Sequence, residues 1–374
     1  MLGIILIAVI FVSIIATAGW WMGSVNSNPE FFVGVEFAYS GNVSDVKSLV
    51  DKVKDYTNLF VIGSIEISFN QTVLNEACDY IVDSGLHLIV FFTDSEVYNY
   101  TIFNWMVEAK QKYGDMFLGV YRYDEPGGNQ LDLGASMLIE NETNYATMAA
   151  NYTNALGLLV NWYMDYSDRV FTADYGLYWF DYKAGYTAVL TEFGWNHSRP
   201  LHIGLCRGAA EAYNRDWGAI VTWEYTDEPY IESKEELYDD MVLAYKNGAK
   251  YVVVFDYPKI EPYGILTDDH FDALKEFWSY IHSNTQEHGV IKGEAAYVLP
   301  QDYGFGFRSA EDKIWGLWQA DDLSEKVWDD ANELIDQYGS RLDIVYSDPE
   351  VMDAIERRYE KLFFWDETIT SSSP

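Results

Sequence analysis

Residues 117–128, FLGVYRYDEPGG, carry the pattern on which the fold depends. An apolar β-type run at 117–123 leads directly into two carboxylates, Asp124 and Glu125, and then into a Pro-Gly-Gly turn. Such a run predicts a buried strand, and the proline and glycines predict that the chain turns away immediately after it. The strand therefore places its acidic residues at its carboxyl end.

The same pattern repeats along the chain, with longer amphipathic segments between the apolar runs. Eight strands alternating with helices over about 250 residues are typical of a (β/α)₈ barrel. An open doubly wound sheet normally has a glycine-rich phosphate loop after its first strand, whereas this chain has FAYSGNVSD at 37–45. We therefore expect an α/β chain built on a (β/α)₈ TIM barrel. The predicted strands are 32–38, 58–64, 87–93, 117–123, 169–175, 187–193, 219–225 and 251–257. The predicted helices include 44–56, 72–85, 198–218 and 233–249.

Changes of composition predict additional segments before and after the barrel in the sequence. The C-terminal part repeats the alternation, with strands expected at 294–300 and 342–347 and helices at 323–338 and 349–365. We expect it to form a small α/β domain. The predicted organisation is a transmembrane anchor or signal peptide at 1–22, a linker at 23–30, the barrel at 31–285, the small domain at 293–366 and a disordered tail at 367–374.

Residues 2–21 form an uncharged apolar run that is long enough to cross a lipid bilayer as a helix. Trp20 and Trp21 stand where an interfacial aromatic belt would lie. No Lys or Arg precedes the run, so the positive region of a secretory signal is missing, although Ala-Thr-Ala at 16–18 leaves cleavage open. We expect an uncleaved single-pass anchor in the cell membrane, with a secreted protein as the alternative.

Six N-x-[ST] sequons favour an extracellular, glycosylated domain. Two cysteines, Cys78 and Cys206, lie far apart without metal-ligand spacing, and we interpret them as buried thiols while a single bridge stays open. The sequon asparagines are Asn42, Asn70, Asn99, Asn141, Asn151 and Asn196.

The net charge and the aromatic content limit the classes of ligand that we expect this chain to bind. With 24 Lys and Arg against 59 Asp and Glu, the formal net charge of −35 argues against nucleic acid, whose phosphates would be repelled. An aromatic content of 17% suits carbohydrate, because sugar rings stack on Trp and Tyr. No His/Asp metal spacing and no G-x-S-x-G motif occurs, so we expect neither a metal nor another cofactor. The sequence leaves the oligomeric state open.

Acidic residues stand at the end of nearly every predicted strand. In a barrel these ends share one face, which carries the chemistry of such folds. Glycoside hydrolysis needs two carboxyl groups across the scissile bond, one as general acid and one as nucleophile or base. The pattern therefore favours a carbohydrate-cleaving site.

YDEP at 123–126 resembles the Asn-Glu-Pro signature of the superfamily of retaining (β/α)₈-barrel glycosidases, which includes cellulases, mannanases and β-galactosidases. The resemblance implies that Glu125, on strand four, is the acid/base. It implies a nucleophile at the end of strand seven, which in VTWEYTDEPY at 221–230 is Glu224. LTEFGWN at 190–196 also resembles the nucleophile strand of several cellulase-like families, so Glu192 is the second candidate. Asp124 stands where the superfamily has Asn, and its charge would raise the pKa of Glu125.

Other side chains near the strand ends are candidates for contact with the sugar. Arg207, within a predicted helix, is expected to form a helix–strand salt bridge instead. The leading hypothesis is a membrane-anchored extracellular glycoside hydrolase; the alternatives are a non-catalytic carbohydrate-binding or structural surface barrel, and a transglycosylase that uses the same two carboxylates. The candidate substrate-binding residues are Glu36, Arg122, Tyr123, Asp124, Asp174, Trp195, Trp223, Tyr225 and Asp256.

Overall fold

The computed structural model describes residues 30–93, 98–260 and 262–369. Residues from Phe32 onward form one compact unit, which is the part described below. The predicted anchor at 2–21 lies outside the described residues. Within the three described ranges, no helix has both the length and the apolar character needed to span a membrane.

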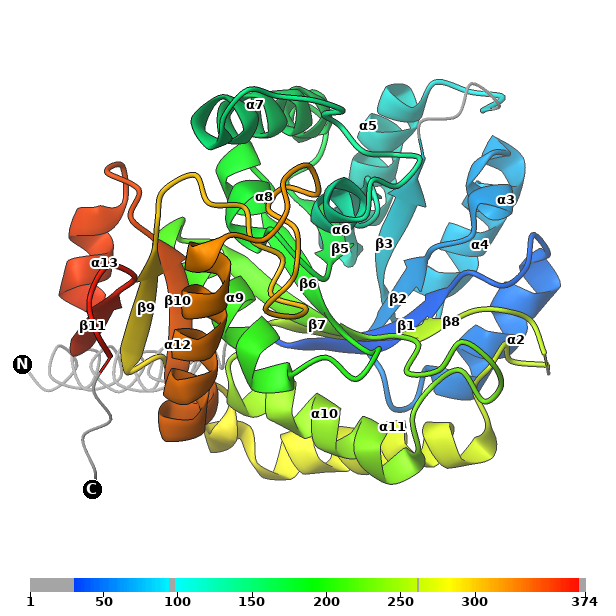
Figure 1. Cartoon of the computed structure of the whole chain (residues 1–374). Coiled ribbons are helices and arrows are strands. Elements are labelled where there is room, and N and C mark those ends of the chain that lie inside the picture. Colours follow the sequence, from blue (N-terminus) through cyan, green and yellow to red (C-terminus); the bar gives the residue numbers. More distant parts are fainter. Residues whose placement is uncertain (1–29, 94–97, 261, 370–374) are drawn as a thin grey trace, which may run out of the picture. The chain divides into compact units, whose positions relative to one another are not determined.

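Eight parallel strands close into a barrel in the order of the sequence, with helices around it, so the predicted (β/α)₈ barrel is confirmed (Figure 1). The strands are β1 (Phe32–Phe37), β2 (Leu59–Ile62), β3 (His87–Phe92), β4 (Phe117–Arg122), β5 (Val170–Asp174), β6 (Ala188–Phe193), β7 (Asp216–Val221) and β8 (Tyr251–Asp256). The helices between them are α2 (Val43–Val53), α3 (Ile65–Ser68), α4 (Gln71–Asp83), α5 (Ile102–Tyr113), α6 (Pro126–Leu131), α7 (Tyr145–Met164), α8 (Tyr178–Ala184), α9 (Arg199–Ala212) and α10 (Lys234–Lys246). The helix α11 (Asp268–Ser283) follows β8, and the short 3₁₀ turn η1 (Gly114–Met116) precedes β4.

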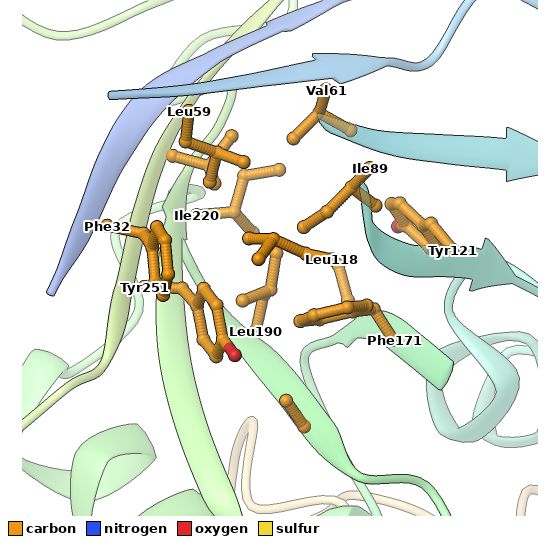
Figure 2. Close-up of a cluster of buried hydrophobic side chains, with 13 residues drawn as sticks. Phe32, Leu59, Val61, Ile89, Leu118, Tyr121, Phe171, Leu190, Ile220 and Tyr251 are labelled. Atoms are coloured by element: carbon orange, nitrogen blue, oxygen red, sulfur yellow. The ribbon is translucent and has the colours of Figure 1, made fainter. Parts of the chain in front are cut away.

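Side chains from all eight strands fill the inside of the barrel (Figure 2). Near the amino ends of the strands, Phe32 stacks on Tyr251 with ring centroids 5.3 Å apart, and Phe171 meets Tyr251 edge-on at 5.1 Å. Leu118 and Tyr121 of β4 belong to the same buried cluster. Because the interior is solid, any site for a ligand must lie at an end of the barrel.

The prediction for the seventh strand was shifted by three residues at its start and four at its end. It placed the strand at 219–225, whereas β7 begins at Asp216, where it pairs with Ala188 of β6, and ends at Val221. The preceding helix ends at Ala212 rather than at 218, because Asn214 adopts a left-handed conformation with φ 51° and turns the chain into β7. Glu224 consequently lies in the loop after β7 and not on the strand.

The C-terminal segment adds a three-stranded parallel sheet in the order β10-β9-β11. Its strands are β9 (Ala295–Leu299), β10 (Leu342–Tyr346) and β11 (Lys361–Phe364), and its helices are α12 (Asp322–Tyr338) and α13 (Met352–Arg358). The helix predicted at 349–365 is therefore wrong in its second half. The apolar, aromatic run Lys361–Phe364 pairs with β9, which offers it a free strand edge.

This sheet packs against the barrel through α9 (Figure 1). A Cβ at Gly208 would lie 2.7 Å from the carbonyl oxygen of Ile344, so glycine permits the close approach of α9 to β10. Beside it, the Arg207 guanidinium lies 2.8 Å from Asp343 of β10, which confirms the expected helix–strand salt bridge. Both cysteines, Cys78 and Cys206, are free buried thiols.

Candidate functional site

The carboxyl ends of β4 and β6 bring two glutamates together. Glu192 lies on β6 with 4% of its side chain exposed, and Glu125 follows β4 in the loop that enters α6. Their carboxyl groups form a hydrogen bond with each other. Two carboxyl groups can form such a bond only when one of them is protonated, so the two glutamates hold one proton between them.

Burial explains why this proton is retained. Desolvation, followed by the charge of Asp124, raises the pKa of Glu125 to about 8. Desolvation, followed by the charges of Glu125 and Asp124, also raises the pKa of Glu192 well above its usual value. Because the two groups interact directly, they titrate as a pair, and one proton remains on the pair at neutral pH.

The turn that carries Glu125 is held in an unusual conformation. Glu125 has φ 49°, in the left-handed region, and Pro126 begins α6 directly after it. Asp174, at the end of β5, accepts hydrogen bonds from the backbone N–H groups of Gly127 at 2.5 Å and Gly128 at 2.9 Å. A Cβ at Gly127 would lie 2.3 Å from the carbonyl oxygen of Gly176. Asp174 therefore holds the turn and orients Glu125.

A second buried acid supports Asp174. Asp181 of α8 is fully buried and accepts a hydrogen bond from the Tyr152 hydroxyl at 3.2 Å, and desolvation followed by the charge of Asp174 raises its pKa well above its usual value. Desolvation raises the pKa of Asp174 to about 7, although its four backbone N–H donors oppose the rise. Sequence reasoning missed Asp181, and its only signal was an acid inside the aromatic run YWFDY at 178–182.

A cavity of about 280 Å³ opens at the same end of the barrel, between the ends of β1, β3, β4 and β8. Two carboxyl side chains, Glu36 and Asp124, contribute to its wall. Tyr121 donates a hydrogen bond to Asp124, whose charge also acts on Glu125. The aromatic part of the wall consists of Phe91, Tyr121, Phe255 and Tyr257. The cavity therefore adjoins the two glutamates through Asp124.

Exposed aromatic rings border the ends of β6, β7 and β8. Trp223 stacks on Tyr257 with an interplanar angle of 15° and centroids 6.0 Å apart, and its indole N–H donates to the Tyr257 carbonyl at 2.7 Å. Trp195 meets Trp223 edge-on at 6.0 Å. Trp195 and Tyr225 remain largely exposed. These rings offer apolar faces to a sugar near the cavity.

Glu224, the other candidate nucleophile, is paired with an arginine. Its carboxylate lies 3.2 Å from the Arg199 guanidinium, which also binds Glu232 at 3.1 Å and Asp240 at 2.8 Å. Desolvation and then the charge of Asp240 raise the pKa of Glu232 to about 8. Sequence reasoning missed this network, because its members come from three separate segments.

Three other predicted residues lie away from the cavity wall. Arg122 is 2% exposed, lies 5.3 Å from the Tyr163 ring of α7 and donates to the Phe92 carbonyl at 3.3 Å. The Tyr123 hydroxyl donates to the Ser136 carbonyl. Asp256 is fully buried and accepts a hydrogen bond from the Ile265 N–H at 2.8 Å. In the described part of the chain, no group of three His, Cys, Asp or Glu side chains could hold a metal ion.

Comparison with known proteins supports the barrel fold. No protein-family model matches the chain, and no curated protein has a matching sequence. Among solved structures, α-L-fucosidase isoenzyme 2 from Paenibacillus thiaminolyticus matches with a TM-score of 0.50 and 10% identity. The match covers 88% of this chain but only 62% of the fucosidase. At this identity it shows the barrel fold and nothing finer.

Weaker matches come from several enzyme classes. One is a structure of the pneumococcal virulence factor StrH, with a TM-score of 0.46, 8% identity and coverage of 70% of this chain and 86% of that one. Another is the GH99 endo-α-mannosidase from Bacteroides thetaiotaomicron, with a TM-score of 0.42, 10% identity and coverage of 69% and 98%. Tryptophan synthase from Mycobacterium tuberculosis also matches, with a TM-score of 0.37, 10% identity and coverage of 68% and 93%. Glycoside hydrolases thus occur among the neighbours together with unrelated barrel enzymes.

Proposed function

We propose that this chain is a glycoside hydrolase that cleaves O-glycosidic bonds by a retaining mechanism, with Glu125 and Glu192 as its two carboxyl groups. The observation that carries the proposal is their hydrogen bond at the carboxyl end of the barrel. Retaining enzymes hold their carboxyl groups about 5–5.5 Å apart, whereas inverting enzymes separate them by about 6.5–9.5 Å to admit a water. A hydrogen-bonded pair lies closer than either separation, so the shorter, retaining separation is the nearer of the two.

The environments of the two groups support separate roles. Glu125 lies in a loop at the rim, where an acid/base must exchange its proton with the leaving group and then with water. Glu192 is fixed on β6 and almost fully buried, which holds it in one orientation toward the anomeric carbon. To act as the nucleophile it must leave the shared proton on Glu125, although their hydrogen bond raises the pKa of Glu192 and lowers that of Glu125. This assignment replaces Glu224, whose carboxylate is bound to Arg199. It also departs from the strand-four and strand-seven arrangement that the sequence resemblance implies.

The extracellular, membrane-anchored location remains part of the proposal. All six sequon asparagines have exposed side chains, so each is accessible to glycosylation. The predicted anchor at 2–21 would tether the barrel to the bilayer, and secretion is the alternative. An electrophoretic shift on treatment with a deglycosylating enzyme, in protein from its native cells, would support an exported domain.

The test is hydrolysis of a panel of oligosaccharides and polysaccharides by the full chain, read as new reducing ends. Glu125→Gln and Glu192→Gln should each lower the rate by about 10²-fold or more. Glu224→Gln, on the same face of the barrel, is the matched control and should keep most of the activity. Retention of anomeric configuration, followed by proton NMR, is expected.

Inversion would contradict the retaining mechanism, and activity that survives both substitutions would refute the site. Sugar binding without turnover on any glycan would favour the non-catalytic alternative.

A further inference from the structure

The cavity beside the two glutamates has an unusual wall. Glu36 is 5% exposed, and its carboxyl group lies in the wall of the cavity. Among the described residues no hydrogen-bond donor contacts this carboxyl group, so a nearly buried acid points into the cavity without a partner. Desolvation, together with the charge of Asp124, raises the pKa of Glu36 well above its usual value.

The rest of the wall is rich in acceptors and aromatic faces. Of the described side chains that line the cavity, the hydroxyl groups of Tyr121 and Tyr257 can donate a hydrogen bond, as can a carboxyl group while it keeps its proton, and Tyr121 already donates to Asp124. Phe91 and Phe255 pack on the barrel core and form the apolar part of the wall. A neutral sugar needs both donors and acceptors for its hydroxyl groups, and this wall supplies few donors.

An ammonium group fits such a wall. It has three donors and no acceptor, it is attracted to carboxylates, and it is stabilised over aromatic faces. A sugar that carries carboxylate or sulfate would instead face two acids and no cation. We infer that this cavity recognises a free amino group on the substrate, so that the glycans cleaved contain amino sugars that are not N-acetylated. The inference rests on the proposed function for turnover, but the recognition itself can be measured without it.

The experiment is direct binding of monosaccharides to the full chain by isothermal titration calorimetry and ligand-observed NMR. The probes are D-glucosamine, D-galactosamine and D-mannosamine, each beside its neutral parent and its N-acetyl derivative. At least one amino sugar should bind roughly tenfold more tightly than both of its counterparts, as expected for a desolvated ammonium over aromatic rings. Added salt should weaken that preference, because it depends on charge.

Two variants test whether the cavity is responsible. Glu36→Gln keeps the shape of the side chain, and it should reduce the preference for the amino sugar over its neutral parent to near unity. Phe255→Leu, which keeps apolar volume but removes a ring, should weaken amino-sugar binding in the same direction. Glu66→Gln is the matched control: Glu66 is an exposed acid in α3 on the same side of the barrel, and its loss should leave the preference intact.

The outcomes separate this inference from the proposed function. If no amino sugar in the three series is preferred, or if Glu36→Gln leaves a preference intact, the inference is overturned, even when the chain hydrolyses a neutral glycan. If the preference appears and depends on Glu36 while no glycan is cleaved, the inference stands and the proposed function fails.

Discussion

The hydrogen bond between Glu125 and Glu192 sets the protonation state of the proposed active site. Both pKa values are raised chiefly because the carboxyl groups are withdrawn from water beside other acids. The raised pKa values keep at least one proton on the pair at neutral pH, as the general acid of a retaining glycosidase requires. The neighbouring Asp124 helps to maintain this state through its charge.

Asp124→Asn should shift the pH dependence of activity. Its charge is one of the causes that raise the pKa of Glu125 to about 8, so an amide at this position should lower that pKa. The alkaline limb of the kcat/KM profile should begin near pH 8 in the native chain and move to lower pH, by roughly one unit, in the variant. The substitution also creates the Asn-Glu-Pro sequence of the retaining superfamily.

Asp227→Asn is the control for this shift, because Asp227 is exposed in the loop after β7. The alkaline limb of the kcat/KM profile should not move in the Asp227→Asn variant. An alkaline limb that stays in place in Asp124→Asn would show that the charge of Asp124 does not act on the catalytic proton.

The turn between β4 and α6 depends on a contact that sequence reasoning could not supply. The sequence located Glu125 correctly, because an apolar run followed by Pro-Gly-Gly is a local signal. The acceptor that fixes the turn is Asp174, which lies 47 residues after Gly127 and reaches it only because β4 and β5 are neighbours in the closed barrel. We predicted that Asp174 contacts the sugar, whereas its carboxyl oxygens accept backbone N–H groups.

Asp174→Asn should therefore impair both the fold and the site. The amide keeps one acceptor oxygen but directs an N–H group at backbone donors, and leaving buried donors unsatisfied costs about 1–3 kcal/mol each. We expect a lower free energy of unfolding in urea and a fall in kcat with little change in KM. Asp115→Asn, in η1 before β4, should change neither. Normal kcat in Asp174→Asn would show that the turn does not need this acceptor.

A second prediction concerns the buried ion pair between α9 and β10. The Arg207–Asp343 pair is fully buried, with Tyr359 and Asn247 completing its hydrogen bonds. Removing one partner leaves a buried charge uncompensated, so Asp343→Asn should destabilise the chain by about 3–5 kcal/mol. Thermal unfolding should stay a single transition, because the sheet and the barrel belong to one compact unit. Arg341→Gln, which removes an exposed ion pair, should cost less than about 1 kcal/mol.

Across the whole chain, local patterns predicted more of the fold than of the site. All eight barrel strands have local signals, and the one marked shift, at β7, arose because the β-forming residues of 219–225 extend past the last residue that pairs with a neighbouring strand. The edge strand β11 was missed because its identity depends on pairing with β9, 66 positions earlier in the register. The Glu125–Glu192 contact likewise depends on how strands four and six are placed by closure. From sequence alone, Glu125 and Glu192 were both candidates, but Glu224 was preferred to Glu192 as the nucleophile.

The buried acids together predict how stability depends on pH. Burial raises the pKa of Glu125 and Glu232 from 4.5 to about 8, and that of Asp174 from 3.8 to about 7. For an acid whose pKa is higher in the folded chain, the unfolded chain releases its proton first. Its contribution to stability is then complete below pH 4 and is lost as pH rises toward 7 or 8. Acids with lowered pKa, such as the half-buried Asp45, lose their contribution only below about pH 4.

The melting temperature should therefore be higher at pH 5 than at pH 8, by about 2–4 °C for each kcal/mol lost in a large domain. The net charge of −35 acts in the same direction through repulsion between surface carboxylates, but 1 M salt screens surface charges beyond about 3 Å. The decrease in melting temperature between pH 5 and pH 8 should thus persist in 1 M NaCl. Glu232→Gln, which removes one of the titrating groups, should make it smaller. A melting temperature that rises from pH 5 to pH 8 in high salt would mean that these acids are ionised in the folded chain and that the proton shared by Glu125 and Glu192 is absent.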